Sequence, residues 1–271
     1  MDFRCAPLSY DTHSGTDFAL RSIAHMERGV NVIPAAPGTV RGTRDGMPDQ
    51  IFTSDLEAEI DGRYCGNGVL IDHGGGWSTQ YCHLKQGSLK VKNGDRVRLT
   101  TVLGQVGLSG RTEFPHVELT VRKNGAIVDP FDPDGEVTCG SPSTETLWQT
   151  PPPYRPGGIL SVGIADAVPD FTDIKAGNAY RETLPMDAPA LVISAHIFGG
   201  QAGDIIALRI DGPEGTVIDK TVVLAKEQAQ LFRAMGKWRK SDWAKGSYSG
   251  TAQLIRDSTV ISTEQSLILI P

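Results

Sequence analysis

Hydrophobic positions in the first half of the chain come in short runs separated by glycine and polar turns. The run Val69–Ile71 is followed by a glycine turn at 73–76, and residues 79–84 resume an extended pattern. Apolar runs bounded by such turns predict a β-hairpin. The chain also holds 31 Gly and 17 Pro without a long amphipathic period, which favours strands over helices. We therefore predict a mainly β protein whose first half is a compact β-sheet domain.

A segment rich in Ser, Thr, Pro and Gly interrupts this pattern at residues 140–158. Its three consecutive prolines, 151–153, would not fit inside a helix or a central strand. We predict a linker here, between a first domain at 1–139 and a β-sandwich accessory domain at 159–271.

The second domain alternates apolar segments with turn residues, and one piece near 225–235 has the pattern of a helix. About seven short strands in ~110 residues predict an immunoglobulin-like sandwich. The expected strands include residues 189–197, 204–211, 217–224, 247–256 and 259–269. His196 is flanked by apolar residues and is expected to be structural.

Charge and hydropathy exclude several classes of function. The formal net charge is −6, and no cluster of Lys or Arg is dense enough to attract nucleic acid or an anionic membrane. No apolar run approaches the ~20 residues of a transmembrane helix. Residues 1–20 lack the pattern of a signal peptide, but a secreted protein expressed without its signal would look the same.

The cysteines indicate the cellular compartment in which the protein works. There are four, scattered along the chain: Cys5, Cys65, Cys82 and Cys139. None forms a close C-x-x-C pair, and an even count fits two disulfides better than a thiolate zinc site. The predicted hairpin puts Cys65 and Cys82 on neighbouring antiparallel strands, and Cys5 then pairs with Cys139 by elimination. Closing that long loop would stabilise the fold by ~4–5 kcal/mol in the chain-entropy model. The alternative is four free, buried thiols in a cytosolic protein.

Five residues carry side chains suited to a metal site: His13, Asp17, His83, His116 and Glu118. His13 and Asp17 lie four residues apart around a glycine, so a loop can bend both toward one point. His116 and Glu118 are separated by one residue in a predicted strand and therefore project from the same face. Imidazole and carboxylate groups are both accepted zinc ligands.

An ordered series of motifs resembles the lysostaphin/LytM-type zinc endopeptidases. The series spans about residues 10–132, nearly all of the first domain. Its members are H-x-G-x-D at 13–17, Y-C-H-L at 81–84, V-K-N-G-D-R-V at 91–97, G-Q-V-G at 104–107, S-G at 109–110, P-H-V-E-L at 115–119 and D-P at 129–130. The resemblance implies a periplasmic or extracellular enzyme that cuts stem or cross-bridge peptides of bacterial cell-wall peptidoglycan.

The resemblance also implies roles for individual residues. His13 and Asp17 would be ligands of one zinc ion per chain, and His83 and His116 would flank the activated water. Glu118 occupies the position of the family's last histidine ligand. A glutamate can bind zinc, but its negative charge would leave the metal less electrophilic and its water less acidic.

Three alternatives for Glu118 follow. In the first it binds zinc and the domain is an endopeptidase, although a slow one. In the second the metal site is lost, and the domain binds peptidoglycan or activates another cell-wall hydrolase. In the third the metal or the hydrolysed substrate is a different one.

Two further features concern substrate binding. Tyr81 is expected on the same strand face as His83, opposite to Cys82, where it would support the site and orient substrate. Segment 41–63 is longer and more acidic than a hairpin turn requires, and we expect it to form a wall of a substrate groove or else a solvated loop.

Overall fold

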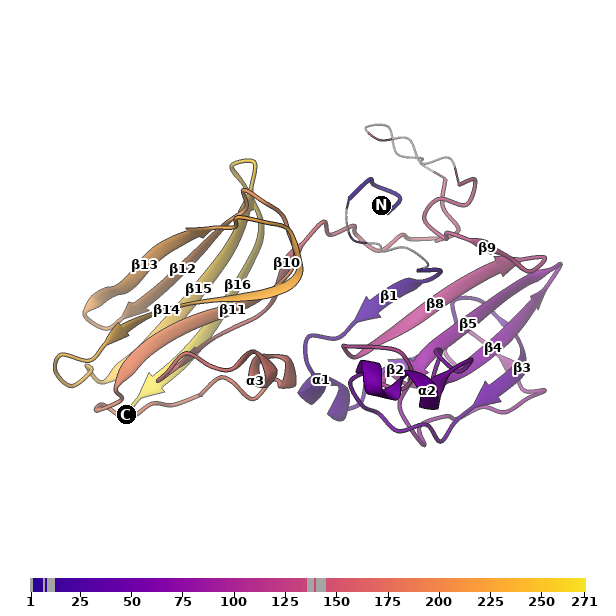
Figure 1. The fold of residues 1–271 in the computed structure, drawn as a ribbon, viewed down its shortest axis with the longest axis horizontal. Coiled ribbons are helices and arrows are strands. Elements are labelled where there is room, and N and C mark those ends of the chain that lie inside the picture. The colour runs from indigo at the N-terminus through magenta and orange to yellow at the C-terminus, as the bar shows by residue number, and fades with distance from the viewer. Residues whose placement is uncertain (1, 7, 9–12, 136–138, 140–144) are drawn as a thin grey trace. The chain divides into compact units, whose positions relative to one another are not determined.

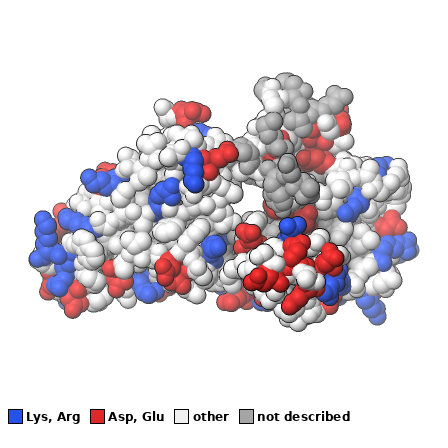
Figure 2. All heavy atoms as spheres, in the orientation of Figure 1, with Lys and Arg blue, Asp and Glu red and all other residues white. Residues whose placement is uncertain are grey.

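The computed structural model describes residues 2–6, 8, 13–135, 139 and 145–271, and Figure 1 shows its elements. The chain divides into two compact units, Met1–Pro152 and Pro153–Pro271. Strands dominate both units, so the prediction of a mainly β chain with a second β domain is confirmed. Within the described residues, no helix is both long and apolar enough to cross a membrane. Acidic and basic side chains are interspersed on the face shown in Figure 2.

The first unit is built on an antiparallel sheet with the strand order β1-β8-β5-β4-β3-β6, and β9 extends it by pairing with β8. A small sheet of β2 and β7 and three short helices complete the unit. The strands are β1 (Thr16–Ala19), β2 (Asn31–Val32), β3 (Gly38–Arg44), β4 (Asn67–Gly74), β5 (Trp77–Leu84), β6 (Arg96–Val97), β7 (Gly104–Gln105), β8 (His116–Lys123) and β9 (Ala126–Val128). The helices are α1 (Ile23–Glu27), the 3-10 helix η1 (Ser54–Leu56) and α2 (Glu57–Ile60).

Strand alternation gives this sheet two different faces. One face carries the core, in which Val69, Ile71 and Leu119 are at most 3% exposed. The opposite face, called the site face below, holds the alternate positions. Its members are Leu70 of β4, Gln80 and Cys82 of β5, and Glu118 and Thr120 of β8. Side chains from three neighbouring strands therefore form one continuous surface.

The second unit consists of two antiparallel sheets that share a core. Buried side chains of both sheets, such as Ile193, Leu208 and Leu254, belong to one hydrophobic cluster. The three-stranded sheet has the order β10-β11-β14 and the four-stranded sheet the order β13-β12-β15-β16. The elements are β10 (Gly158–Ala165), α3 (Phe171–Ala176), β11 (Ala190–Gly200), β12 (Ile205–Gly212), β13 (Gly215–Val223), β14 (Gln228–Trp238), β15 (Gly246–Arg256) and β16 (Thr259–Ile270).

The helix expected near 225–235 is wrong, because this segment forms β14 and pairs with β11. The strand carries apolar side chains on both of its faces. Leu231 is buried in the core, and Phe232 on the opposite face stacks on Phe171 of α3, with 5.2 Å between ring centroids. Two apolar faces hide the two-residue alternation by which a half-buried strand is recognised.

His196 of β11 leads to a prediction about stability. Its ring is 3% exposed, lies 5.3 Å from the ring of Phe171, and neither ring nitrogen has a hydrogen-bond partner among the described residues. The pKa of His196 is lowered from 6.5 to about 4, mainly by burial. The charge of Lys175 also lowers this pKa, and the side chain of Gln230 raises it by a smaller amount. Because the folded-state pKa lies below the unfolded value, stability is lost as the pH falls through 6.5 toward 4.

We expect the second unit to lose about 3 kcal/mol of stability from this group between neutral pH and pH 4. Hydrogen exchange of the β11 amides, corrected for the intrinsic rate, measures the loss for this unit alone. His196→Leu is the matched control, because its side chain carries no charge at any pH. Equal pH dependence in the two proteins would contradict the prediction.

Candidate active site

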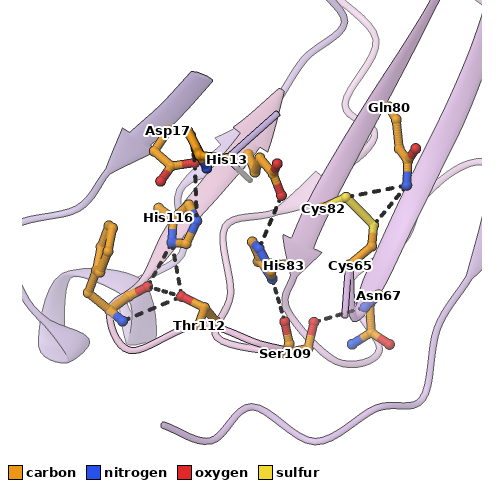
Figure 3. Close-up of polar contacts among 12 residues, drawn as sticks. His13, Asp17, Cys65, Asn67, Gln80, Cys82, His83, Ser109, Thr112 and His116 are labelled. Carbon is orange, nitrogen blue, oxygen red and sulfur yellow. Dashed lines mark hydrogen bonds and ion pairs between the residues drawn. A yellow bond between two sulfur atoms is a disulfide. The ribbon is translucent and has the colours of Figure 1, made fainter. Parts of the chain in front are cut away.

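The five residues with metal-site side chains lie together in the first unit, and Figure 3 labels four of them, His13, Asp17, His83 and His116. Nε2 of His13 is 3.6 Å from Oδ1 of Asp17, and Nε2 of His116 is 3.4 Å from the same oxygen. Nε2 of His83 is 3.4 Å from Oε2 of Glu118. The rings of His83 and His116 are 4.6 Å apart between centroids. Side chains from a loop and three strands thus form one cluster.

The register of the sheet explains why these residues meet. β8 lies between β1 and β5, and its Glu118 has Asp17 of β1 as its partner on one side and Cys82 of β5 on the other. His116 is two residues before Glu118 and therefore projects from the same face. His83 follows Cys82 directly. Because β8 pairs with both β1 and β5, it brings Asp17 and His83 to the same place as its own His116 and Glu118.

Gly15, the central glycine of the H-x-G-x-D motif, makes room for Glu118. A Cβ atom at Gly15 would lie 2.5 Å from Cγ and 2.7 Å from Oε1 of Glu118. The Glu118 side chain is therefore packed against the loop that carries His13.

His83 has an unusual backbone conformation. Its φ is +61°, which is rare for a residue with a side chain, and its side chain is buried. Such a conformation costs ~1–3 kcal/mol and persists only where the surroundings hold it. Here the His83 N–H donates to the carbonyl of Cys65 at 2.8 Å, and its carbonyl accepts from Gly107 at 3.0 Å. The Cys65–Cys82 disulfide holds the adjacent residue.

This backbone conformation corrects the expectation for Tyr81. Regular alternation would place Tyr81 and His83 on the same face, but the positive φ turns the His83 ring toward Glu118. Tyr81 is only 3% exposed and lies in the core, where its hydroxyl accepts from the Ala35 N–H at 2.7 Å and from the Thr79 hydroxyl at 3.1 Å. It supports the sheet from the core, and a role in orienting substrate stays a prediction.

Two backbone carbonyls set the tautomers of the site histidines. Nδ1 of His83 is 2.8 Å from the carbonyl oxygen of Ser109, and Nδ1 of His116 is 2.9 Å from that of Phe114. Because a carbonyl only accepts, each Nδ1 carries a proton. In a neutral ring, Nε2 then presents its lone pair toward the carboxylates.

Buried polar side chains hold these carbonyls in place. The Thr112 hydroxyl donates to the Phe114 carbonyl at 2.8 Å and lies 3.1 Å from Nδ1 of His116. The Ser109 hydroxyl donates to the Leu84 carbonyl at 2.8 Å and accepts from the Asn67 N–H at 2.9 Å. Of these supports, only the S-G motif at 109–110 was visible in the sequence. A carbonyl belongs to every residue, so no sequence signal marks the ones that orient a histidine.

The charges of the cluster follow from its burial. Burial lowers the pKa of His116 more than Asp17 raises it, so the ring is neutral at pH 7. The contact with His83 lowers the pKa of Glu118 although burial opposes it, so Glu118 is ionised. Oδ1 of Asp17 is buried without a hydrogen bond from any described residue. Nε2 of the neutral His116 ring therefore lies 3.4 Å from Oδ1 of Asp17 without a hydrogen bond between these two atoms.

The spacing of two of these donors matches that of a zinc shell. In a tetrahedral shell with bonds of ~2.0–2.1 Å, two ligand atoms lie ~3.3 Å apart, close to the 3.6 Å between His13 and Asp17. Zinc would also satisfy the buried Oδ1 of Asp17. Among the described side chains, no three His, Cys, Asp or Glu already converge as a complete shell. Glu118 would have to turn from His83 toward His13 to complete it.

The segment at 41–63 lies along the loop that supports the histidines. The N–H groups of Gln50 and Phe52 donate to the carbonyls of Leu108 and Thr112 at 3.0 and 2.8 Å. The carboxylate of Asp49 accepts from the N–H of Leu108 at 2.7 Å. This part of the segment is therefore tied to the site rather than being a solvated loop.

The structure contains two disulfides, Cys5–Cys139 and Cys65–Cys82, which are the pairs favoured by the sequence. The described residues include no free cysteine. Cys65–Cys82 lies directly beside the site, because Cys82 is the cross-strand partner of Glu118.

Comparison with known proteins places this site in a family. Residues 11–130 match the sequence model of Peptidase family M23. The match includes all five residues of the cluster. Residues 11–130 of the chain therefore belong to peptidase family M23.

Individual relatives are similar over the same domain. The peptidoglycan DD-endopeptidase ShyA of Vibrio cholerae is 34% identical over 112 residues, which are 41% of this chain and 20% of that protein. The DD-carboxypeptidase/endopeptidase Mpg of Neisseria meningitidis is 42% identical over 65 residues, 24% of this chain and 14% of that protein. The chain spans about a fifth or less of the length of these curated relatives.

Solved structures show only a slight overall likeness. A zinc-containing peptidase from Vibrio cholerae is 28% identical with a TM-score of 0.33, and the match covers 43% of this chain and 29% of that one. The catalytic domain of lysostaphin from Staphylococcus simulans is 21% identical with a TM-score of 0.34, over 46% of this chain and 82% of that one.

Proposed function

We propose that this protein is a zinc-dependent endopeptidase that hydrolyses peptide bonds of bacterial cell-wall peptidoglycan. The observation that carries the proposal is the buried Oδ1 of Asp17, which receives no hydrogen bond from the described residues and faces Nε2 of both His13 and His116. A cation is the partner that such a group requires. The peptidoglycan substrate is supported by the similarity to ShyA, a peptidoglycan DD-endopeptidase.

His13, Asp17 and Glu118 would hold the zinc ion, which supplies a Lewis acid and lowers the pKa of a bound water. The chain's own residues contribute the remaining steps. His83 and His116 keep their protons on Nδ1, so Nε2 of either ring can take a proton from the attacking water. Once protonated, the ring stabilises the negative charge that develops on the carbonyl oxygen of the scissile peptide.

A second candidate function is supported by the contact between Glu118 and His83. If this contact persists, Glu118 is not a metal ligand and Nε2 of His83 is not free to accept a proton. The domain would then bind peptidoglycan without cutting it, or activate another cell-wall hydrolase.

Both candidates imply work outside the cytoplasm. Peptidoglycan lies there, and two disulfides persist in an oxidising compartment. We infer a periplasmic or extracellular location.

We also propose an immunoglobulin-like architecture for the accessory domain at 159–271, with 140–158 as the linker. Seven strands in two antiparallel sheets support it. β13, the fourth strand of this unit, pairs with β12 and so belongs to the four-stranded sheet. In the constant-type immunoglobulin arrangement the fourth strand instead belongs to the sheet of the first, second and fifth strands.

The proposal predicts about one zinc ion per chain and hydrolysis of purified peptidoglycan. Elemental analysis of protein equilibrated with zinc measures the first, and the release of new amino groups measures the second. Removing the metal with a chelator should stop hydrolysis, and zinc should restore it. A protein that refuses zinc and cuts nothing would overturn the endopeptidase. Raised dye release from labelled peptidoglycan on mixing with a wall amidase would then support the activator.

A further inference from the structure

A pocket of about 220 Å³ opens beside the Cys65–Cys82 disulfide, and the mechanism above does not use it. It is formed by β3, β4, β5 and the turn that precedes β4. The lining residues are Gly42, Thr43, Arg44, Cys65, Gly66, Gly68, Val69, Leu70 and Gln80. Its volume suits one amino-acid side chain, since a single water takes ~30 Å³.

Strand register puts this pocket on the site face. Gln80 is the cross-strand partner of Thr120 and of Leu70, and Leu70 is the partner of Gly42. Glu118 is two residues before Thr120 on the same face. The pocket therefore lies one to three strand spacings from Glu118, ~5–14 Å, which an extended peptide covers in ~2–4 residues.

The lining combines apolar surface with a cation. Leu70 is 37% exposed, and the Gln80 amide donates to the sulfurs of Cys65 and Cys82 at 3.2 and 3.4 Å. Figure 3 shows this amide directed toward the disulfide. The Gln80 carbonyl oxygen accepts from Arg122 at 2.9 Å, which fixes the side chain.

Arg44 supplies the charge. Its Nε donates to the Gly66 carbonyl at 2.5 Å and its Nη2 to the Arg63 carbonyl at 3.4 Å. In the described part of the chain no carboxylate pairs with it. Burial, and then the nearby Arg63, lower the pKa of its guanidinium. A half-buried cation that is held only by neutral carbonyls is positioned to receive an anion.

Resting on the proposed function, we propose that this pocket is a specificity subsite for a carboxylate-bearing residue of the wall peptide. The aliphatic part of that residue packs on Leu70 and the disulfide, and its carboxylate accepts from Arg44. The subsite thereby sets which peptide lies across Glu118 and the two histidines. It also keeps the substrate carboxylate away from the negative charges of Asp17 and Glu118.

Gly42 offers a direct way to close the pocket. A Cβ atom there would meet only Cβ of Leu70, at 3.9 Å, and its backbone is not in the left-handed region. The other two glycines differ, because a Cβ would lie 2.3 Å from the Ser109 carbonyl oxygen at Gly66 and 2.5 Å from that of Tyr81 at Gly68. Gly42→Leu therefore fills the pocket while the sheet is preserved.

The test measures binding of soluble, fluorescently labelled muropeptides to the full chain carrying His116→Ala, which slows turnover enough for binding to be measured. The probe is used as purified and after its carboxylates have been amidated. We expect amidation to weaken binding ~10-fold, the loss of one charge-assisted hydrogen bond. Gly42→Leu and Arg44→Gln should each bind both probes equally and weakly.

Arg41→Gln is the matched control. It removes the same charge from the same strand, but Arg41 is exposed and pairs with Asp72 at 3.1 Å outside the pocket. It should keep the tenfold discrimination. Thermal melting checks that each variant is folded, and Gly42→Ala provides a smaller filler if the leucine disturbs the strand.

Each outcome bears on the subsite separately from the hydrolysis. Discrimination that survives Gly42→Leu, or binding that is insensitive to amidation or absent, overturns the subsite. If the chain with His116 intact cuts nothing while discrimination persists, the endopeptidase fails and the subsite stands. If that chain cuts peptidoglycan but shows no discrimination, only the subsite fails.

Discussion

Replacing Glu118 by histidine is expected to raise the rate of peptidoglycan hydrolysis at least ~10-fold, equivalent to ~1.4 kcal/mol of transition-state stabilisation. If Glu118 holds zinc as proposed, the substitution would remove a negative charge from the ligand set, which would make the metal more electrophilic and a bound water more acidic. It also removes the carboxylate that lies 3.4 Å from Nε2 of His83, which frees this nitrogen to accept a proton. Initial rates on purified peptidoglycan measure the effect.

Glu118→Gln is the matched control for shape. It keeps the length and the packing against Gly15 but loses the charge of the ligand. Because changes to groups that merely support metal ligands already lower metal affinity ~10–100-fold, losing a ligand should lower zinc affinity by ~100-fold or more. Titration with zinc, with a competing chelator, measures it. Unchanged affinity in Glu118→Gln would show that Glu118 is not a ligand and would favour the non-enzymatic function.

Replacing either His83 or His116 by alanine is expected to lower kcat by ~10²–10⁴, the usual contribution of a general acid or base. Zinc content should stay at the level of the unsubstituted protein, because neither ring is assigned to the metal. Buried neutral His116 offers Nε2 as the acceptor, and His83 offers Nε2 once Glu118 has turned away from it. Rates combined with elemental analysis therefore separate these two residues from His13 and Asp17.

His25→Ala serves as the control for this comparison. It removes an imidazole of α1 outside the cluster and should leave both kcat and zinc content unchanged. Loss of zinc in His83→Ala would contradict the assignment and would make His83, not Glu118, the third ligand.

Much of the site could be predicted because its residues lie in short local patterns. His13 and Asp17 are four positions apart and His116 and Glu118 are two positions apart, and a loop or a strand sets the geometry of such short spacings by itself. The hairpin between β4 and β5 was likewise visible in its glycine turn. These features depend on neighbours in sequence, which any local pattern records.

Other features depend on contacts between distant segments. The left-handed backbone of His83 reverses the face that alternation predicts, and it is held by Cys65 and Gly107. The segment near 225–235 has a short helical pattern but forms a strand that pairs with β11. This pairing satisfies its backbone hydrogen bonds and also buries Leu231.

The sequence by itself therefore determined the mainly β class and predicted which five residues meet in the cluster. Only the tertiary structure decided which oxygen and nitrogen atoms face one another, that Tyr81 belongs to the core, and that Gly42 and Arg44 border a pocket on the site face. The physical reason is that register and backbone conformation are set by long-range pairing. A register shift of one residue, or a left-handed residue such as His83, moves a side chain to the opposite face of the sheet.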